Sequence, residues 1–144
     1  MKALTKETIK IMLVENDEND VFFLRRALTH AGYTNPLIHL QNGKAAVNYF
    51  KTLEASSSAS VPDIALMDIK MPVMDGFDVL SWLRQESSFK ELPVIMLSSS
   101  DDLSDMTKSR RLGIYKFLTK QVHYDNVISS LESFLLLPKG PPSP

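Results

Sequence analysis

Short apolar runs alternate along the chain with longer segments in which apolar residues recur every three or four positions. The short runs have the length of strands and the longer segments have the period of helices, so the pattern predicts βα units around a parallel sheet. The predicted strands cover residues 9–14, 37–40, 63–67, 94–97 and 115–118. Five such units fit an open, doubly wound sheet or a truncated barrel. The open sheet is favoured because a barrel of this kind needs eight units to close.

The intervening segments place apolar residues on one helical face. These residues are Val21, Leu24, Leu28 and Ala31 in the first segment, Ala46, Val47, Phe50 and Leu53 in the second, Phe77, Leu80 and Leu83 in the third, and Val127, Ile128, Leu131 and Phe134 in the last. The fourth helix is predicted in the segment after Ser98, which carries Asp101, Asp102 and Asp105 early and Lys108, Arg110 and Arg111 late, the order that suits a helix dipole. Gly32 and Gly113 are expected to end two of these helices. One residue of the stretch 98–101 is expected to cap the fourth helix.

The chain has 144 residues, which suits one domain, and its hydrophobic fraction of 44% and charged fraction of 23% are ordinary for a globular protein. We expect an N-terminal extension at 1–8, a folded domain at 9–137 and a disordered, proline-rich tail at 138–144. The absence of cysteine excludes disulfides, thiolate metal sites and a cysteine nucleophile.

Charge and hydropathy argue against nucleic-acid and membrane partners. The net charge is −1. The small basic patch of Lys108, Arg110 and Arg111 is better explained as a solvated helix end than as a surface that binds nucleic-acid phosphates. No apolar run approaches the roughly 18 residues of a membrane span, and no apolar core follows the N-terminus as in a signal peptide. We therefore expect a cytoplasmic protein.

Polar residues follow four of the five predicted strands. Glu15 and Asn16 come after the first, Asp68 after the third, Ser98 after the fourth and Lys120 after the fifth. Ligands of open parallel sheets bind outside the carboxyl ends of the strands, so these residues are expected to converge. Taken singly, each has an ordinary explanation as a turn, cap or surface residue. Their conjunction at four strand ends favours a site.

The chemistry open to such a group is specific. Carboxyl oxygens bind a hard divalent cation such as Mg²⁺, and a carboxylate is an accepted nucleophile for phosphoryl transfer. A lysine pairs with phosphoryl oxygens, and a hydroxyl donates a hydrogen bond to one of them.

Residues 68–76 read Asp-Ile-Lys-Met-Pro-Val-Met-Asp-Gly and resemble the D-x-x-M-P-x-M-D-G phosphorylation loop of the receiver domains of bacterial two-component response regulators. The resemblance runs from about Ile9 to Leu136. The strand that ends in Ser98 is similar to the one that ends in the family's switch Ser/Thr. Lys120 stands at the family's lysine and Phe117 at its aromatic switch position. The stretch 14–21 is most similar to stand-alone receivers that are paired with phytochrome kinases.

The resemblance implies an α/β flavodoxin-like (βα)5 fold, with a doubly wound five-stranded parallel sheet in the strand order 2-1-3-4-5. Asp68 would accept a phosphoryl group from a sensor histidine kinase, and Ser98 and Lys120 would bind that group. The Mg²⁺ site would consist of Glu15, Asn16, Asp68 and the main-chain carbonyl of Lys70. Phosphorylation would move Ser98 and Phe117 and reshape the surface formed by the fourth helix, fifth strand and fifth helix.

The same resemblance implies a signalling domain that promotes only its own phosphoryl transfer and dephosphorylation. Because only a short tail follows the last helix, output is expected through protein contact: with a separate effector, with a phosphotransfer protein, or as a phosphate sink. The resemblance also offers a homodimer through the surface of the fourth helix, fifth strand and fifth helix.

Two residues depart from the family pattern. Asn16 stands where the family has a second acid, which predicts weaker metal binding. Gln121 follows Lys120 where the family has a cis proline, so the bond is expected either to relax to trans or to be held in a strained form. These departures motivate an alternative, a phosphorylation-independent interaction module. A metal-dependent phosphatase is less favoured, because Lys70 stands where a second catalytic acid would be needed.

Overall fold

The five apolar runs form the five parallel strands of one sheet in a computed structural model that describes residues 4–56 and 61–138. The strands are β1 (Ile11–Val14), β2 (Ile38–Leu40), β3 (Ile64–Asp68), β4 (Val94–Ser98) and β5 (Lys116–Thr119). They lie in the order β2-β1-β3-β4-β5, which confirms the predicted topology. The predicted domain boundaries stay predictions, and residues 1–3 of the extension and 139–144 of the tail lie outside the described residues.

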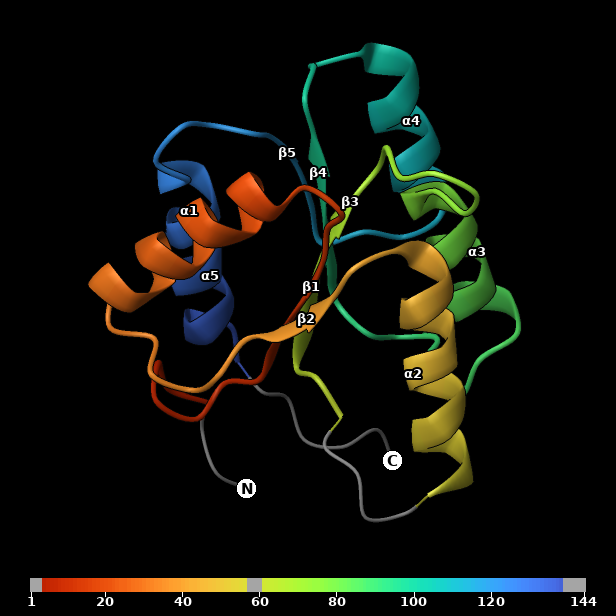
Figure 1. The fold of residues 1–144 in the computed structure, drawn as a ribbon, viewed down its shortest axis with the longest axis horizontal. Helices are drawn as coiled ribbons and strands as arrows, with labels where there is room; N and C mark the ends of the chain where they lie inside the picture. The colour runs from red at the N-terminus through yellow and green to blue at the C-terminus, as the bar shows by residue number, and fades with distance from the viewer. Residues whose placement is uncertain (1–3, 57–60, 139–144) are drawn as a thin grey trace.

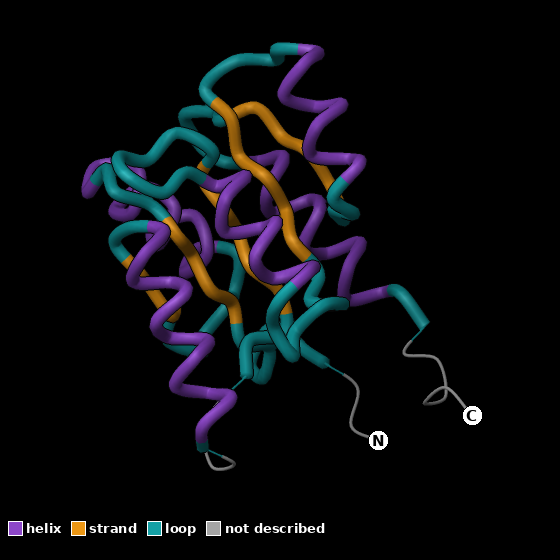
Figure 2. The backbone as a smooth tube through the Cα atoms, turned by 90° about the vertical axis from the view of Figure 1, so that its right-hand side faces the viewer, coloured by secondary structure: helices purple, strands orange, loops and turns teal. Residues whose placement is uncertain are grey.

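Five helices of the described chain cover both faces of this sheet: α1 (Glu18–His30), α2 (Gly43–Ala55), α3 (Gly76–Gln85), α4 (Leu103–Arg111) and α5 (Asp125–Leu136). Figure 1 shows α1 and α5 on one side and α2, α3 and α4 on the other. In Figure 2, viewed from the second side, helices lie in front of the strands. The sheet is therefore the middle of three layers, as expected for βα units wound in both directions.

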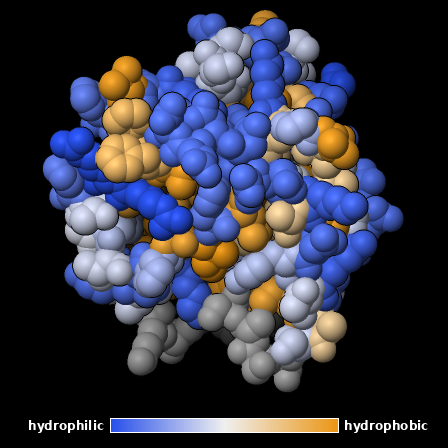
Figure 3. All heavy atoms as spheres, viewed as in Figure 1, coloured by the Kyte–Doolittle hydropathy of each residue, from blue (hydrophilic) through white to orange (hydrophobic). Residues whose placement is uncertain are grey.

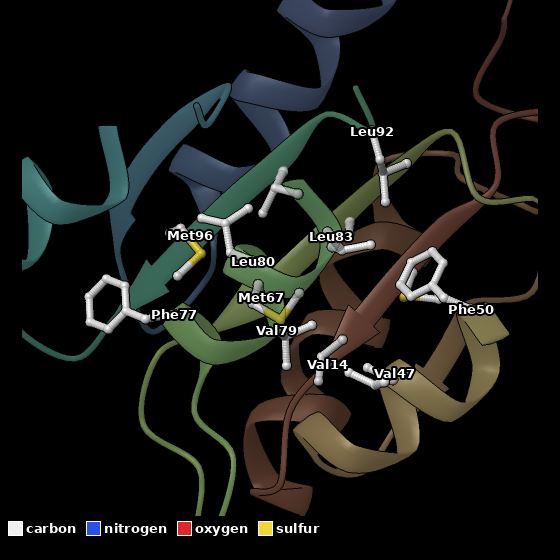
Figure 4. Packing of buried hydrophobic residues seen from close by; sticks show 14 of the residues in the cluster. Val14, Val47, Phe50, Met67, Phe77, Val79, Leu80, Leu83, Leu92 and Met96 are labelled. Atoms are coloured by element: carbon white, nitrogen blue, oxygen red, sulfur yellow. The ribbon is translucent and has the colours of Figure 1, made fainter. Parts of the chain in front are cut away.

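Alternation along the strands supplies a core to each face of the sheet. Met12, Val14 and Met67 point towards α2 and α3, whereas Leu13 and Leu66 on the same strands point towards α1 and α5. Figure 4 shows the first of these cores, to which α2 contributes Phe50 and α3 contributes Leu83. Because both faces are covered, the inner strands are apolar throughout, and their polar residues appear only where the strands end.

Side chains of acids and amides begin most of the helices. Asp17 caps α1, Asn42 caps α2, and Asp75 forms a reciprocal capping box with Asp78 at α3. The predicted cap of α4 is wrong by one residue. The cap is Asp102, whose side chain accepts the backbone N–H groups of residues 104 and 105.

The strands run towards the top of Figure 1, so the loops that follow them meet at that edge of the sheet. In Figure 3, hydrophilic residues cover most of the same view, and hydrophobic ones gather in the middle, between the two layers of helices. Within residues 4–56 and 61–138, no helix is both long and apolar enough to cross a bilayer.

Candidate functional site

Lys120 lies at the centre of a cluster of three carboxylates at the carboxyl edge of the sheet. Its Nζ is 2.8 Å from Oε1 of Glu15, 2.9 Å from Oδ2 of Asp20 and 3.2 Å from Oδ1 of Asp68. The Glu15 and Asp68 side chains are almost fully buried, and the lysine side chain is only 17% exposed. We call Glu15, Asp20, Asp68 and Lys120 the acidic cluster. It unites residues from β3, α1 and the loops after β1 and β5.

The backbone fixes Glu15 at the end of β1. Its N–H donates to the carbonyl of Leu40 at 3.1 Å, which continues the pairing of β1 with β2 by one residue. Nε2 of His39 lies 2.9 Å from the Glu15 carbonyl oxygen. The second carboxyl oxygen, Oε2, accepts the N–H of Asp17 at 3.2 Å. Glu15 is thus held by main chain on one side and by Lys120 on the other.

Asp68 is the last residue of β3, and the loop after it returns tightly to begin α3. The N–H of Gly76 donates to the carbonyl of Ile69 at 2.8 Å. A side chain at Gly76 would collide with the main-chain carbonyl of Asp68, so only glycine allows this approach. At the loop tip Val73 has a φ of 68°, and the N–H of Met74 donates to the carbonyl of Pro72 at 2.8 Å. A β-branched residue with this φ is strained.

Ser98 and Phe117 lie on the neighbouring strands β4 and β5. Ser98 is buried, and its Oγ accepts the N–H of Ser100 at 3.2 Å. The carbonyl of Ser98 accepts the N–H of Lys120 at 2.7 Å, which ties the ends of the two strands together. Phe117 is half-buried and packs against the core on the α2–α3 side. The switch residues predicted from the sequence therefore line the strands that border the cluster.

The remaining predicted metal ligands differ from Glu15 and Asp68 in their surroundings. Asn16 and Lys70 have exposed side chains. Asn16 directly follows the buried Glu15, and Lys70 comes two residues after the buried Asp68. Asp17 does not replace the missing acid, because its side chain accepts the N–H groups of Asn19 and Asp20 as the cap of α1. No peptide bond of the described chain is cis, so the Lys120–Gln121 bond is trans, the first of the two predicted outcomes.

Burial dominates the electrostatics of the cluster. It raises the pKa of Glu15 from 4.5 to about 7, helped by the charge of Asp68 and opposed by the hydrogen bond from Lys120. Burial also raises the pKa of Asp68, again opposed by Lys120. For Lys120, burial lowers the pKa, but the hydrogen bonds to Glu15 and Asp20 outweigh it and raise the pKa above its ordinary value. Lys120 therefore stays charged while its two buried partners resist ionisation.

The donor set fits a divalent cation in chemistry. Fully ionised, the acidic cluster carries three negative charges and one positive charge, and the oxygens belong to carboxylates, the ligands that Mg²⁺ prefers. Among the described residues, no three His, Cys, Asp or Glu side chains are arranged to hold a metal by themselves. A metal here would thus need oxygens of other kinds, such as the amide of Asn16 and the carbonyl of Lys70.

Sequence reasoning missed two members of this neighbourhood. Asp20 lies on α1 and not at a strand end, so the strand-end rule could not select it. Tyr124 is buried at the start of α5 with a φ of 55°, and burial together with the charge of Asp20 raises its pKa. The position of Asp20 one helical turn after Asn16, in the acidic run 15–20, was the available signal.

The chain resembles known proteins over most of its length. The family model described as the response regulator receiver domain matches residues 11–132. Response regulator Rcp1 of Synechocystis sp. is 28% identical over 129 residues, which cover 88% of this chain and 88% of that protein.

Solved structures agree with the sequence comparison. The phosphorylated cyanobacterial phytochrome response regulator RcpA superposes with a TM-score of 0.78 at 28% identity, covering 94% of this chain and 99% of that one. The Mn²⁺-bound form of Rcp1 gives a TM-score of 0.74 at 26% identity, covering 93% and 99%.

Proposed function

The chain belongs to the family of response regulator receiver domains, and on that premise we propose that Asp68 accepts a phosphoryl group from a sensor histidine kinase. The observation that supports this most is the contact of the Asp68 carboxylate with the Lys120 ammonium at 3.2 Å, inside a buried cluster at the carboxyl edge of the sheet. A nucleophile and a cation that can receive phosphoryl oxygens are thus already together.

In the proposed reaction, a carboxylate oxygen of Asp68 attacks the phosphorus of a phosphohistidine on the kinase. A P–O bond forms, the P–N bond breaks, and its electron pair stays on the imidazole nitrogen of the donor. Lys120 pairs with a phosphoryl oxygen as negative charge leaves the Asp68 carboxylate. The Ser98 hydroxyl donates a hydrogen bond to another phosphoryl oxygen. Hydrolysis of the acyl phosphate later restores Asp68, so the chain promotes only its own cycle.

We propose that Mg²⁺ is the cofactor, held by Glu15, Asn16, Asp68 and the main-chain carbonyl of Lys70. Bound there, it would supply positive charge that offsets the repulsion between Asp68 and an anionic donor. The Mn²⁺-bound form of the similar protein Rcp1 supports a divalent cation in this family. Since Asn16 brings no charge, binding is expected to be weaker than in receivers with an acid there.

The proposed output is a changed surface on α4, β5 and α5. Ser98 would turn from its contact with Ser100 towards the phosphoryl group, and the half-buried Phe117 would follow into the space that is vacated. Helix α4 buries little of its surface: among its residues only Ser109 is buried. A helix with so little apolar burial is free to shift at low cost.

The second candidate is a receiver that signals without phosphorylation. It is favoured by the observation that Lys120 already satisfies Glu15 and Asp68, in a cluster whose second family acid is replaced by the exposed Asn16. Partner binding would then depend on the surface alone and not on the state of Asp68.

Intact mass separates the two candidates. The chain is incubated with acetyl phosphate and millimolar Mg²⁺ beside Asp68→Ala and the isosteric Asp68→Asn, whose folding is checked by fluorescence of Trp82. We expect the mass of the wild type to increase by one phosphoryl group and the mass of either variant to stay unchanged. An unchanged wild-type mass at every Mg²⁺ concentration would leave the interaction module as the better account.

A further inference from the structure

Asp20 reaches the acidic cluster from a helix, unlike the other members. It lies on the first turn of α1, 100 residues from Lys120 in sequence, and its Oδ2 is 2.9 Å from the lysine Nζ. Its side chain is 31% exposed, whereas Glu15 and Asp68 are buried. Asp20 is thus the outer partner of the ammonium, on the side where the cluster opens to solvent.

The hydrogen-bond geometry assigns each partner of Lys120 a separate role. An ammonium group has three N–H donors, and three carboxylate oxygens lie between 2.8 and 3.2 Å from Nζ, one for each donor. Phosphorylation changes only one of these acceptors, because the Asp68 carboxylate becomes an acyl phosphate and loses its own charge. If Glu15 and Asp20 keep their bonds, a single N–H has to redirect to the new phosphoryl oxygen.

The loop after Lys120 does not itself restrain the orientation of the lysine side chain. Gln121 follows Lys120, so the backbone lacks a proline ring that would fix φ at this point. A lysine side chain has four rotatable bonds and loses considerable freedom when it is held in one geometry. The restraint must therefore come from side-chain contacts.

Packing around Asp20 holds its carboxylate in place, so that it can restrain Lys120. Tyr124, which is buried, adjoins Asp20, and a shallow hollow of about 280 Å³ borders Asp20, Phe23, Lys120, Gln121, Val122 and Tyr124. Asp20 and Lys120 both line this hollow, which lies between α1 and the loop that leads to α5. Asp20 is therefore fixed by its helix and by Tyr124 and is able to fix Lys120 in turn.

We infer that Asp20 is a positioning residue that holds the Lys120 ammonium in the orientation that receives the phosphoryl group, and that it stays paired with Lys120 after transfer. The inference rests on the proposed phosphorylation of Asp68. It also opposes a purely electrostatic expectation: Asp20 repels an anionic donor, so removal of its charge should speed the reaction if charge alone mattered.

The test measures the rate constant of phosphorylation by acetyl phosphate at saturating Mg²⁺ for the wild type, Asp20→Ala, Asp20→Asn and Asp20→Glu. Glu18→Gln is the matched control, because it removes an exposed carboxylate from the same first turn of α1. We expect Asp20→Ala to be about tenfold to a hundredfold slower. We expect an intermediate rate for Asp20→Asn, rescue by Asp20→Glu and no change for the control.

Two further readouts separate positioning from other roles. The Mg²⁺ concentration for half-maximal rate should not change in the Asp20 variants. In ¹⁵N-labelled protein, the ammonium signal of Lys120 should be visible in the unphosphorylated wild type and lost in Asp20→Asn and Asp20→Ala.

An Asp20→Ala rate equal to or above the wild type overturns the inference, as does a defect that higher Mg²⁺ removes, since Asp20 would then act through the metal. If Asp20→Ala does not fold, Asp20→Asn decides the same question. If the wild type is not phosphorylated at all, the proposed function fails. The ammonium signal then still tests whether Asp20 orients Lys120.

Discussion

Glu15→Gln should stabilise the metal-free protein at alkaline pH, although it removes a salt bridge. Folding raises the pKa of Glu15 from 4.5 to about 7, a value that already includes its attraction to Lys120. Each pKa unit corresponds to about 1.4 kcal/mol, so ionised Glu15 costs the folded state about 3 kcal/mol relative to the protonated form. Glutamine has the shape of the protonated form and never ionises.

The sign of the pH dependence follows from proton binding. A carboxyl group with a raised pKa binds its proton more tightly in the folded state than in the unfolded state. Stability from this group is therefore complete below pH 4.5 and is lost as the pH rises towards 7. The variant does not lose stability in this way. Its free energy of unfolding, relative to that of the wild type, should therefore increase by roughly 2–3 kcal/mol between pH 5 and 8.

Urea unfolding followed by the fluorescence of Trp82, the single tryptophan, measures this difference in a buffer free of divalent cations. Glu18→Gln, which removes an exposed carboxylate from the first turn of α1, is the control and should show no such trend. Mg²⁺ should reduce the difference in unfolding free energy between the variant and the wild type, because it stabilises the folded wild type that binds it. A difference in unfolding free energy that does not change with pH, or a variant less stable than the wild type at pH 8, would refute the reasoning.

Three further predictions concern backbone geometry, two of them beside the site and the third at the opposite edge of the sheet, where β4 and β5 begin. Val73→Gly should raise the free energy of unfolding by up to about 1 kcal/mol in urea, because Val73 is strained at φ 68° and almost fully exposed. Gly76→Ala should lower it by about 1–3 kcal/mol and slow phosphorylation, because the new methyl group would displace the Asp68 carbonyl; normal values of both would contradict the packing. Arg84→Met should cost at least about 2 kcal/mol and speed hydrogen exchange at the end of α4, because the guanidinium donates to the carbonyls of Lys90, Leu92, Leu112 and Gly113.

The fold could be predicted from the sequence because its inner strands are covered on both faces. Runs such as 94–97 are apolar throughout and end at a polar residue, which locates Glu15, Asp68 and Ser98. Lys120 was selected by the same strand-end rule, although it follows β5, an edge strand that contains the exposed Lys116. The strand order came from the resemblance to a family and not from periodicity. It is the order that the structure has.

The third partner of Lys120, Asp20, could not be predicted in the same way. Its contact depends on how far a helix side chain reaches across the carboxyl edge of the sheet, and the strand ends do not indicate this. Asp20 therefore remained one acid among several in the run 15–20, where Asp17 became a helix cap and Asp20 a salt-bridge partner. The cap of α4 was misplaced for a related reason: Ser98 continues β4, so the helix begins later than the first polar residues suggest.

Borohydride reduction tests the central claim most directly, because it converts an aspartyl phosphate into homoserine and so marks the residue that carried the phosphoryl group. The protein is phosphorylated by a histidine kinase or acetyl phosphate with Mg²⁺, reduced, digested and sequenced by mass spectrometry. We expect homoserine at position 68 and at no other aspartate, and none when the phosphoryl donor is omitted. Aspartate retained at position 68, or homoserine at Asp20 or another acid, would contradict it.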